Sequence, residues 1–263
     1  MPSIRVGIGG WTFPPWRGVF YPPGLPHARE LAYASEHLTT IEINGTFYGA
    51  QKPESFARWR AETPDGFVFS VKAARATTHR KDPAEIEASV HRFLGSGVTE
   101  LGEKLGPILW QFPPTRQFDA QAFEGFLALL PNALDGVPLR HVVEARHSSF
   151  DDPAAIALLR RFGVARAMID SDKQHLLGDQ TADFVYARLQ RSQEAQPDGY
   201  PPDALDLWAG RFRAWSRGDA VTDLPLVDAA AAPAPRDCYV YFISGDKVRA
   251  PAAAMAMLGR VGG

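Results

Sequence analysis

Apolar and polar residues alternate in eight short segments of the chain, and stretches with helical periodicity separate these segments. In residues 39–49, TTIEINGTFYG, the β-branched residues favour a strand, whereas Glu42 and Asn44 take the alternate, polar positions. A strand with such a polar face either faces water or lines a closed barrel. The eight predicted strands cover residues 4–11, 39–47, 67–73, 107–112, 140–146, 164–170, 184–190 and 238–244.

Helices are predicted between the strands. Two of them have clear start signals, Asp82-Pro83 and Asp152-Pro153, in which an aspartate can cap the helix and a proline suits its first turn. Residues 171–183 are too short and polar for a full helix, and residues 218–237 predict a long surface loop. The predicted helices cover residues 27–37, 53–62, 83–95, 119–130, 153–162, 203–217 and 250–260.

The alternation of strands and helices predicts a parallel sheet in an α/β fold. Eight strand–helix units in about 250 residues are typical of a (β/α)8 barrel, and we therefore expect one TIM-barrel-like domain over residues 1–263. An open doubly wound sheet is the alternative. Such a sheet usually carries G-x-G-x-x-G after its first strand, and the sequence here is Gly7-Ile8-Gly9-Gly10-Trp11, which does not match.

A closed barrel turns alternate residues of each strand inward, with functional side chains at the carboxyl ends. If Glu42 and Asn44 point inward, the same alternation in the other strands leaves mostly apolar residues facing the helices. The charged members of the inward set all fall late in their strands, so we expect them to meet at one mouth of the barrel. Besides Glu42 and Asn44, this set contains Trp11, Lys72, Gln111, Glu144, Arg146, Asp170 and Arg188.

The overall composition is that of an ordinary globular protein, with 45% hydrophobic and 22% charged residues among 263. A formal net charge of −2 argues against a strongly basic nucleic-acid binder. The single cysteine, Cys238, excludes an internal disulfide and fits a reducing compartment. No segment has the length and apolarity of a signal peptide or a membrane span, so we expect a cytoplasmic protein without membrane association.

The predicted mouth contains three acidic and three basic side chains, so its lining is nearly neutral. Cationic groups in such a cleft favour a small anionic or polyhydroxylated substrate. Glu42 and Glu144 are the predicted acid–base pair, and a glycosidase would place them about 5 to 10 Å apart. For Lys72, a Schiff base or general base is one interpretation, but the flanking acids favour its ammonium form. We therefore expect Lys72 to hold substrate charge. A set of buried ion pairs with a purely structural role is the remaining alternative.

Aromatic and histidine side chains add candidate substrate contacts at the same mouth. Trp11 and Tyr48 can stack on a sugar or a base, although large aromatics at strand ends more often pack under loops. His79 and His147 are candidate binding residues. The alternatives are a surface residue for His79 and, for His147, a loop histidine that caps the Asp151-Asp152-Pro153 turn.

Metal-assisted hydrolysis is an alternative chemistry that we do not favour. It needs about three histidine or carboxylate ligands, and the sequence contains no H-x-H or HExxH motif. Three cationic side chains in the same cavity would also repel a divalent ion. We therefore assign no metal site and no cofactor. The available ligands would be Glu42, Glu144, Asp170, His79 and His147.

Six motifs in order along the chain resemble the YecE-like family, a domain of unknown function. They are GGWTFPPWRGVFYP, EINGTFYG, FSVKAARATTH, LWQFPP, VVEARHSSF and DFVYARLQ. The resemblance implies a TIM-barrel-like fold and no established reaction. Its characteristic positions correspond here to Trp11, Trp16, Glu42, Asn44, Phe47, Tyr48, Lys72, His79, Gln111, Pro113, Glu144, Arg146, His147, Tyr186 and Arg188.

The chain departs from the family pattern at two places. Many members have His-Gly after the seventh strand and Asn-Asn after the eighth, where this chain has Gln190-Arg191 and Ile243-Ser244. Binding roles at those positions therefore do not carry over. Our leading hypothesis is a hydrolase or lyase that acts on a small polar or phosphorylated molecule, sugar-like or nucleotide-like. The alternative is a non-catalytic module that binds nucleic acid or a metabolite, and the sequence has no signal for an oligomeric state.

Overall fold

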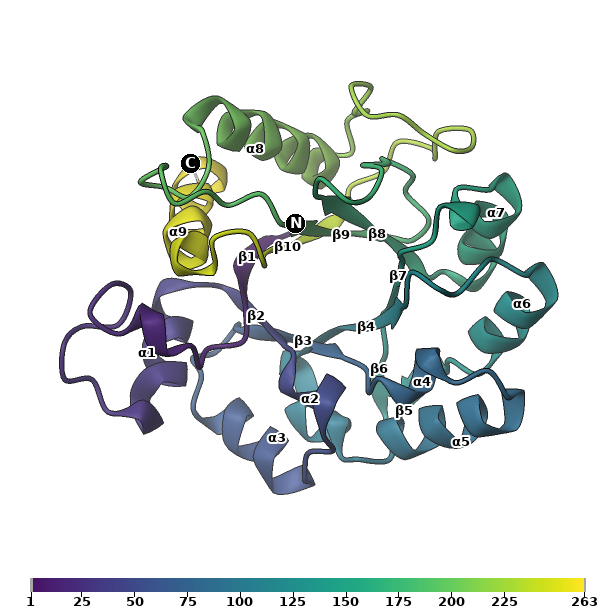
Figure 1. Cartoon of the computed structure of the whole chain (residues 1–263), viewed down its shortest axis with the longest axis horizontal. Coiled ribbons are helices and arrows are strands. Elements are labelled where there is room, and N and C mark those ends of the chain that lie inside the picture. The colour runs from purple at the N-terminus through teal and green to yellow at the C-terminus, as the bar shows by residue number, and fades with distance from the viewer. Residues whose placement is uncertain (1, 263) are drawn as a thin grey trace.

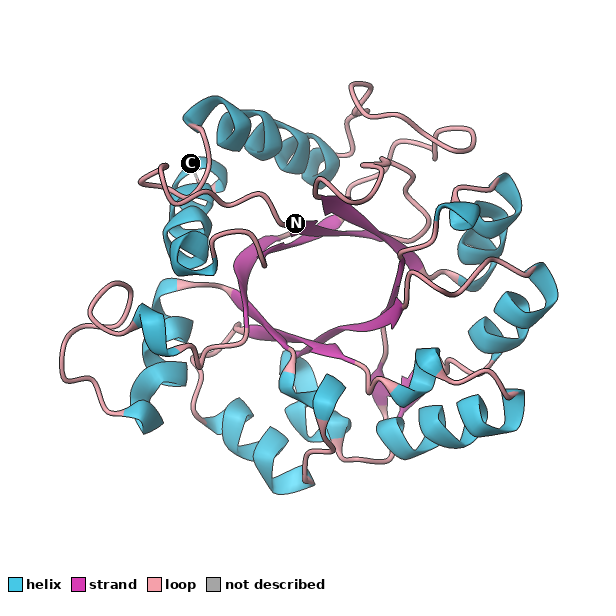
Figure 2. Ribbon diagram, viewed as in Figure 1, coloured by secondary structure: helices cyan, strands magenta, loops and turns pink. Residues whose placement is uncertain are grey.

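The computed structural model describes residues 2–262, in which eight parallel strands close into a barrel in the order β1-β10-β9-β8-β7-β4-β3-β2. Figure 1 shows the barrel surrounded by helices, and Figure 2 shows its strands as one ring. The predicted TIM-barrel-like fold is thus confirmed. The strands are β1 (Ile4–Gly9), β2 (Thr40–Ile43), β3 (Val68–Lys72), β4 (Leu105–Phe112), β7 (His141–Ala145), β8 (Ala165–Asp170), β9 (Phe184–Leu189) and β10 (Asp237–Phe242), with a separate hairpin of β5 (Ala133–Leu134) and β6 (Val137–Pro138).

The helices lie around the outside of the barrel, and their bounds agree closely with the predicted ranges. The two predicted caps form, because Asp82 accepts a hydrogen bond from the Glu85 N–H and Asp152 accepts one from the Ala154 N–H. Across residues 2–262, no helix is both long and apolar enough to cross a bilayer. The main helices are α1 (Glu30–His37), α3 (Pro53–Ala61), α5 (Pro83–Leu94), α6 (Ala120–Ala128), α7 (Pro153–Phe162), α8 (Pro202–Arg217) and α9 (Ala250–Val261).

Short helical segments account for most differences from the predicted elements. The strand predicted for residues 39–47 ends at Ile43, because the chain turns at Asn44 into a single helical turn. The loops predicted for 171–183 and 218–237 contain no α-helix, although β10 begins at Asp237. The short segments are α2 (Gly45–Tyr48) and α4 (Ala76–His79), with 3-10 turns η1 (Pro14–Trp16), η2 (His27–Arg29), η3 (Val98–Lys104), η4 (Ser148–Phe150) and η5 (Lys247–Arg249).

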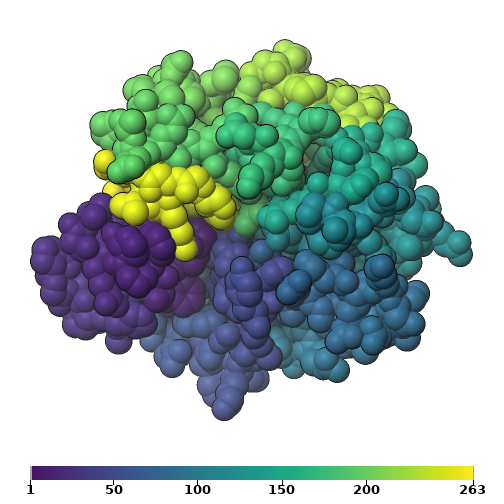
Figure 3. Space-filling view, in the orientation of Figure 1, coloured from purple at the N-terminus to yellow at the C-terminus, as the bar shows by residue number. Residues whose placement is uncertain are grey.

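Two apolar layers hold the barrel together. The larger layer lies between strands and helices, where residues such as Ile8, Ile41 and Phe69 are fully buried. The smaller layer fills the barrel interior with side chains that include Leu109, Val142 and Tyr241. In the space-filling view, side chains fill the ring that looks open in the ribbon views (Figure 3). The polar mouth therefore rests on a packed interior rather than on a pore.

Candidate functional site

Glu42 points into the barrel from the end of β2 and is completely buried. The Tyr186 hydroxyl donates a hydrogen bond of 2.6 Å to Glu42 Oε2, and Arg188 donates from Nε at 3.1 Å and from Nη2 at 3.0 Å. The Ser70 hydroxyl lies 2.8 Å from the Tyr186 hydroxyl and extends this network. The predicted inward orientation of Glu42 is therefore observed, and both of its carboxylate oxygens accept hydrogen bonds.

Glu144 occupies the equivalent position at the end of β7 and is also sealed from solvent. Arg146 Nε donates to Glu144 Oε1 at 2.7 Å, and Arg188 Nη1 donates to Oε2. Burial alone would raise the pKa of Glu144, but the charges of Arg188 and Arg146 outweigh burial and lower the pKa to about 2. Glu144 is therefore ionised at neutral pH, with both oxygens occupied.

Arg188 lies between the two carboxylates and joins three strands across the barrel interior. Its side chain is 3% exposed, and it forms charge-assisted hydrogen bonds to both Glu42 and Glu144. Burial opposes its charge, yet the two carboxylates raise the pKa of Arg188 above its already high ordinary value. This guanidinium therefore carries a permanent charge in a fixed orientation just below the mouth.

Lys72, at the end of β3, is 7% exposed, and its Nζ atom lies 3.8 Å from the centre of the Phe47 ring. Burial lowers the pKa of Lys72 most and Arg188 lowers it further, while Glu42 and Glu144 raise it. The net pKa is about 8, against an ordinary value of 10.5. The expected stabilisation of its ammonium form by the acids is thus outweighed, chiefly by burial and further by the charge of Arg188.

A cavity of about 550 Å³ opens above these residues at the carboxyl ends of the strands. Its ionisable lining groups are cationic, apart from one histidine and one tyrosine, and none of its lining residues within the described part of the chain is a carboxylate. Gln111 is 5% exposed, and its Nε2 atom is buried without a partner. The lining residues that bear on the argument are Asn44, Phe47, Tyr48, Lys72, Arg75, His79, Gln111, Arg146, Arg188 and Lys247.

Seven residues predicted from the sequence line this cavity. Glu42 and Glu144 lie beneath it, where they accept hydrogen bonds from the lining residues Arg188 and Arg146. Two further cationic residues line the cavity, Arg75 and Lys247, and neither was predicted from the sequence. Arg75 follows β3 by three residues, and Lys247 begins the 3-10 turn after β10. A cation shortly after the carboxyl end of a strand was the available signal for both. The seven predicted residues are Asn44, Tyr48, Lys72, His79, Gln111, Arg146 and Arg188.

Trp11 lies in the strand–helix layer rather than at the mouth. Its ring makes an edge contact with Trp59 of α3 at 5.2 Å between centroids and another with Phe69 at 6.4 Å. The backbone causes this placement, because β1 ends at Gly9 and Gly10 adopts a left-handed conformation with φ of +70°. The strict alternation that predicted an inward Trp11 does not continue through such a turn.

Asp170 also faces outward, toward α8, because Ile169 takes the inward position at the end of β8. Its Oδ2 atom accepts a hydrogen bond of 3.2 Å from Trp208 Nε1, and Arg191 lies 3.3 Å from Oδ1. Burial raises the pKa of Asp170, although Arg191 partly opposes this shift. The predicted inward orientation of Asp170 is wrong by one residue, since β8 has no polar alternation to fix its phase.

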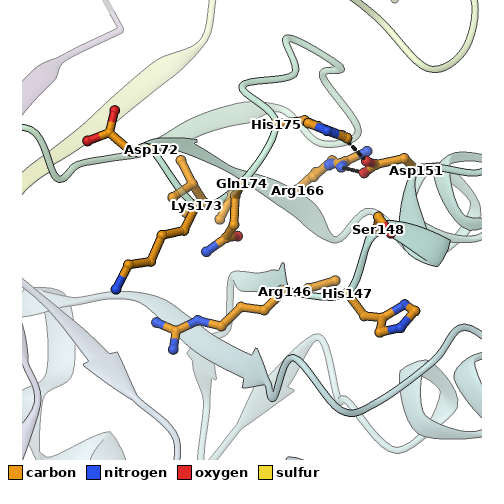
Figure 4. A pocket seen from close by; sticks show the side chains of 12 residues that line it. Arg146, His147, Ser148, Asp151, Arg166, Asp172, Lys173, Gln174 and His175 are labelled. Carbon is orange, nitrogen blue, oxygen red and sulfur yellow. Dashed lines mark hydrogen bonds and ion pairs between the residues drawn. The ribbon is translucent and has the colours of Figure 1, made fainter.

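The two predicted histidines occupy different places. His79 lines the mouth, with its ring 5.7 Å from that of Phe47, and burial followed by the charge of Arg75 lowers its pKa. The Nδ1 atom of His147 accepts a hydrogen bond of 3.1 Å from the Ser149 N–H and so caps η4, whereas the turn-capping alternative placed the cap on the Asp151-Asp152-Pro153 turn. His147 also borders a smaller second pocket, in which its ring turns away from Arg146 (Figure 4).

Metal-ligating residues are dispersed. Within residues 2–262, no group of three or more His, Cys, Asp or Glu side chains is arranged to hold a metal ion. The carboxylates nearest the mouth, Glu42 and Glu144, are instead bound to arginines. No cofactor is assigned to this site.

The comparison with known families gives a match over residues 5–263 to the family described as "Protein of unknown function DUF72". The chain belongs to the DUF72 family. It is similar to the UPF0759 protein YecE of Escherichia coli strain K12, with 28% identity over 178 residues. This alignment covers 65% of the present chain and 61% of the length of YecE. The predicted resemblance to YecE-like proteins is confirmed.

Solved structures show the same DUF72 fold. A DUF72 family protein of Thermotoga maritima superimposes with a TM-score of 0.76 at 23% identity, and the superposition covers 99% of this chain and 100% of that one. The protein SacUVDE gives a TM-score of 0.55 at 8% identity and covers 99% of both chains. At these identities the similarity concerns the barrel architecture. The chemistry of this DUF72 protein must be argued from its own site.

Proposed function

We propose that this DUF72 protein is an enzyme that acts on a small polar, phosphorylated substrate, sugar-like or nucleotide-like, with the anionic group held in the mouth cavity. One observation supports this most strongly. Five cationic side chains line the cavity, and the two nearby carboxylates are sealed beneath it by arginines. Such a lining favours phosphate or carboxylate oxygens over a neutral or cationic ligand. The five cations are Lys72, Arg75, Arg146, Arg188 and Lys247.

Prior orientation of these cations favours binding. Glu42 and Glu144 fix Arg188, and Glu144 also fixes Arg146 through its Nε atom, which leaves the terminal nitrogens of Arg146 for a ligand. The side chain of Gln111 adds a neutral polar group to the lining. Donors that are held in place before binding lose little conformational entropy when the anion arrives.

Lys72 is the group best suited to proton transfer. With a pKa of about 8, about a tenth of its amines are neutral at pH 7, so Lys72 can accept a proton near neutral pH. Glu144 is less suited, because its pKa is about 2 and both of its oxygens already accept hydrogen bonds. A glycosidase needs one protonated carboxyl group. We therefore propose lyase-type proton abstraction by Lys72 beside an anion held by the other cations of the mouth, with Glu42 and Glu144 orienting the arginines.

The pH dependence of turnover tests this assignment. Purified protein is assayed against a panel of phosphorylated sugars and nucleotides, and kcat/KM of any substrate found is followed from pH 4 to 10. We expect kcat/KM to rise with a midpoint at about pH 8 and to level off above it, and this limb should be absent in Lys72→Met. A limb below pH 5 that disappears in Glu144→Gln would instead support carboxylate acid–base chemistry and contradict the assignment to Lys72.

The alternative function, a non-catalytic nucleic-acid binding module, is favoured by one observation. Tyr48 is 84% exposed at the rim and, together with Phe47, also lines a neighbouring hollow that contains Arg75 and Arg92. Aromatic rings beside arginines are typical of surfaces that stack single-stranded bases. Binding of a single-stranded oligonucleotide that weakens steeply with salt and with Tyr48→Ala, with no turnover of any small substrate, would support this alternative.

A further inference from the structure

A second pocket lies in the opening between β7 and β8. Only two residue pairs are in register between these strands, Val142 with Ala165 and Val143 with Arg166, whereas β4 and β7 have five. Beyond the second pair the strands separate, and a cavity of about 220 Å³ occupies the gap (Figure 4). Its lining includes Ala145, Arg146, Asp151, Arg166, Lys173 and His175.

The two carboxylates of this pocket already have cationic partners. Asp151 Oδ1 accepts a hydrogen bond of 2.6 Å from Arg166 Nη2, and Asp151 Oδ2 lies 2.8 Å from His175 Nδ1. The carboxylate of Asp172 lies 2.9 Å from Arg191 Nη2. The acids are therefore paired within the protein, and these pairs involve neither Lys173 nor the Nη1 atom of Arg166.

Donors without partners remain in the same pocket. Arg166 Nη1 is buried and has no hydrogen-bond partner, which is costly for a charged group unless an acceptor occupies the pocket. Lys173 forms no ion pair within residues 2–262, and it lines the pocket next to Gln174. Figure 4 shows the amine of Lys173, the amide of Gln174 and the guanidinium of Arg146 on the same side of the pocket. Arg166 lies on the opposite side of the pocket, beside Asp151, so cationic and polar donors border the pocket on both sides and favour an anionic ligand.

Arg146 connects this pocket to the mouth, because it lines both cavities. We propose that the pocket between β7 and β8 is a second anion subsite, and that the substrate is a small molecule with two separated anionic groups. One group lies in the mouth and the other lies against Arg166, while Lys173 and Gln174 line the side of the second pocket nearer Arg146. This inference rests on the proposed function, since it extends the same substrate from one cavity into the next.

The size of the second pocket favours a terminal phosphate or carboxylate over a ring or a polymer. A volume of 220 Å³ corresponds to roughly seven water molecules at about 30 Å³ each in the liquid, which is enough for one hydrated anionic group. A bis-anionic metabolite therefore fits the two cavities better than a nucleic-acid strand, whose backbone would need a continuous groove.

Calorimetry with a matched pair of probes tests the second subsite. Fructose 6-phosphate and fructose 1,6-bisphosphate are titrated into the full chain, and the ratio of their dissociation constants is measured. We expect the bisphosphate to bind at least tenfold tighter. Lys173→Gln and Arg166→Lys should each reduce this ratio severalfold. Lys52→Gln is the matched control, because Lys52 is exposed and lies outside both cavities.

The outcomes separate the second subsite from the proposed function. If both probes bind with similar affinity, the second subsite is overturned, while the anion-binding mouth stands. If neither probe binds, the proposed function fails for sugar phosphates and the second subsite fails with it. The small-molecule assignment is overturned if a single-stranded oligonucleotide binds while the bisphosphate does not, and if Lys173→Gln weakens the binding of that oligonucleotide. Should Arg166→Lys unfold, Lys173→Gln alone decides the result.

Discussion

Arg188 on β9 holds Glu42 on β2 through two hydrogen bonds, from Nε to Oε2 at 3.1 Å and from Nη2 to Oε1 at 3.0 Å. The two strands are separated by β10 and β1 in the barrel order, so this pair crosses the interior. The third nitrogen of the same guanidinium donates to Glu144. The pair thus has two effects, since it ties distant strands together and it keeps a cation fixed under the mouth.

Removal of the Arg188 charge should destabilise the fold strongly. Arg188→Met leaves Glu42 and Glu144 buried without their shared partner, and we expect a loss of about 3 to 5 kcal/mol in the free energy of unfolding. Urea denaturation at pH 7 measures this loss. The control is Arg217→Met, which breaks an exposed pair with Asp219 and should cost less than about 1 kcal/mol. A loss of similar size in both variants would contradict the account.

Acid should weaken the fold through Glu144. Its pKa falls from 4.5 to about 2 on folding, so its contribution is fully present above pH 4.5 and is lost as the pH falls toward 2. The shift corresponds to about 3 kcal/mol. The free energy of unfolding of the native protein should therefore decrease over this pH range, and the decrease should be smaller in Glu144→Gln. Equal slopes for both proteins would show that Glu144 has an ordinary pKa in the folded state.

The charge of Glu144 should also raise the pKa of Lys72. Because this carboxylate raises the pKa of Lys72 while burial and Arg188 lower it, Glu144→Gln should move that pKa below 8. NMR titration of isotopically dimethylated lysines measures the change. Glu194→Gln serves as the control, because Glu194 is exposed and lines neither the mouth nor the second pocket. An unchanged or higher pKa in Glu144→Gln would contradict the electrostatic account of the mouth.

Trp11 should contribute to stability rather than to binding. Trp11→Ala removes its edge contacts with Trp59 and Phe69, and we expect a loss of roughly 2 to 4 kcal/mol in unfolding free energy. The affinity for sugar phosphates should remain that of the native protein. A variant that kept its stability but lost affinity would place Trp11 at the ligand.

The fold could be predicted from the sequence because periodicity alone separates strands from helices here. The helix at Pro153–Phe162 begins and ends where the Asp152-Pro153 signal and the apolar spacing predicted. Alternation in β2 and β3 correctly placed Glu42 and Lys72 inward, since Ile41, Ile43 and Val71 fix the opposite face. Single helical turns such as α2 could not be predicted, because so few residues carry no periodicity.

Site residues could be predicted only in strands whose inward and outward faces are clear from the sequence. The direction of the Trp11 side chain could not be predicted, because the backbone turns at Gly10. The direction of Asp170 could not be predicted either, because apolar residues occupy both faces of β8. The pairing of Glu144 with Arg146 and Arg188 depends on contacts between separate strands, which alternation within one strand does not specify. For this reason the sequence predicted acid–base chemistry for Glu42 and Glu144, whereas the structure holds both carboxylates in ion pairs beneath a cationic mouth.

The most direct test of the central claim is calorimetric binding of fructose 6-phosphate, fructose and inorganic phosphate to the native protein and to Arg75→Met, which removes one cation of the mouth. We expect that fructose 6-phosphate and inorganic phosphate bind, that fructose does not, and that Arg75→Met weakens the binding of both phosphate ligands about tenfold or more. Equal affinity for fructose and fructose 6-phosphate, or phosphate binding unaffected by Arg75→Met, would contradict this claim.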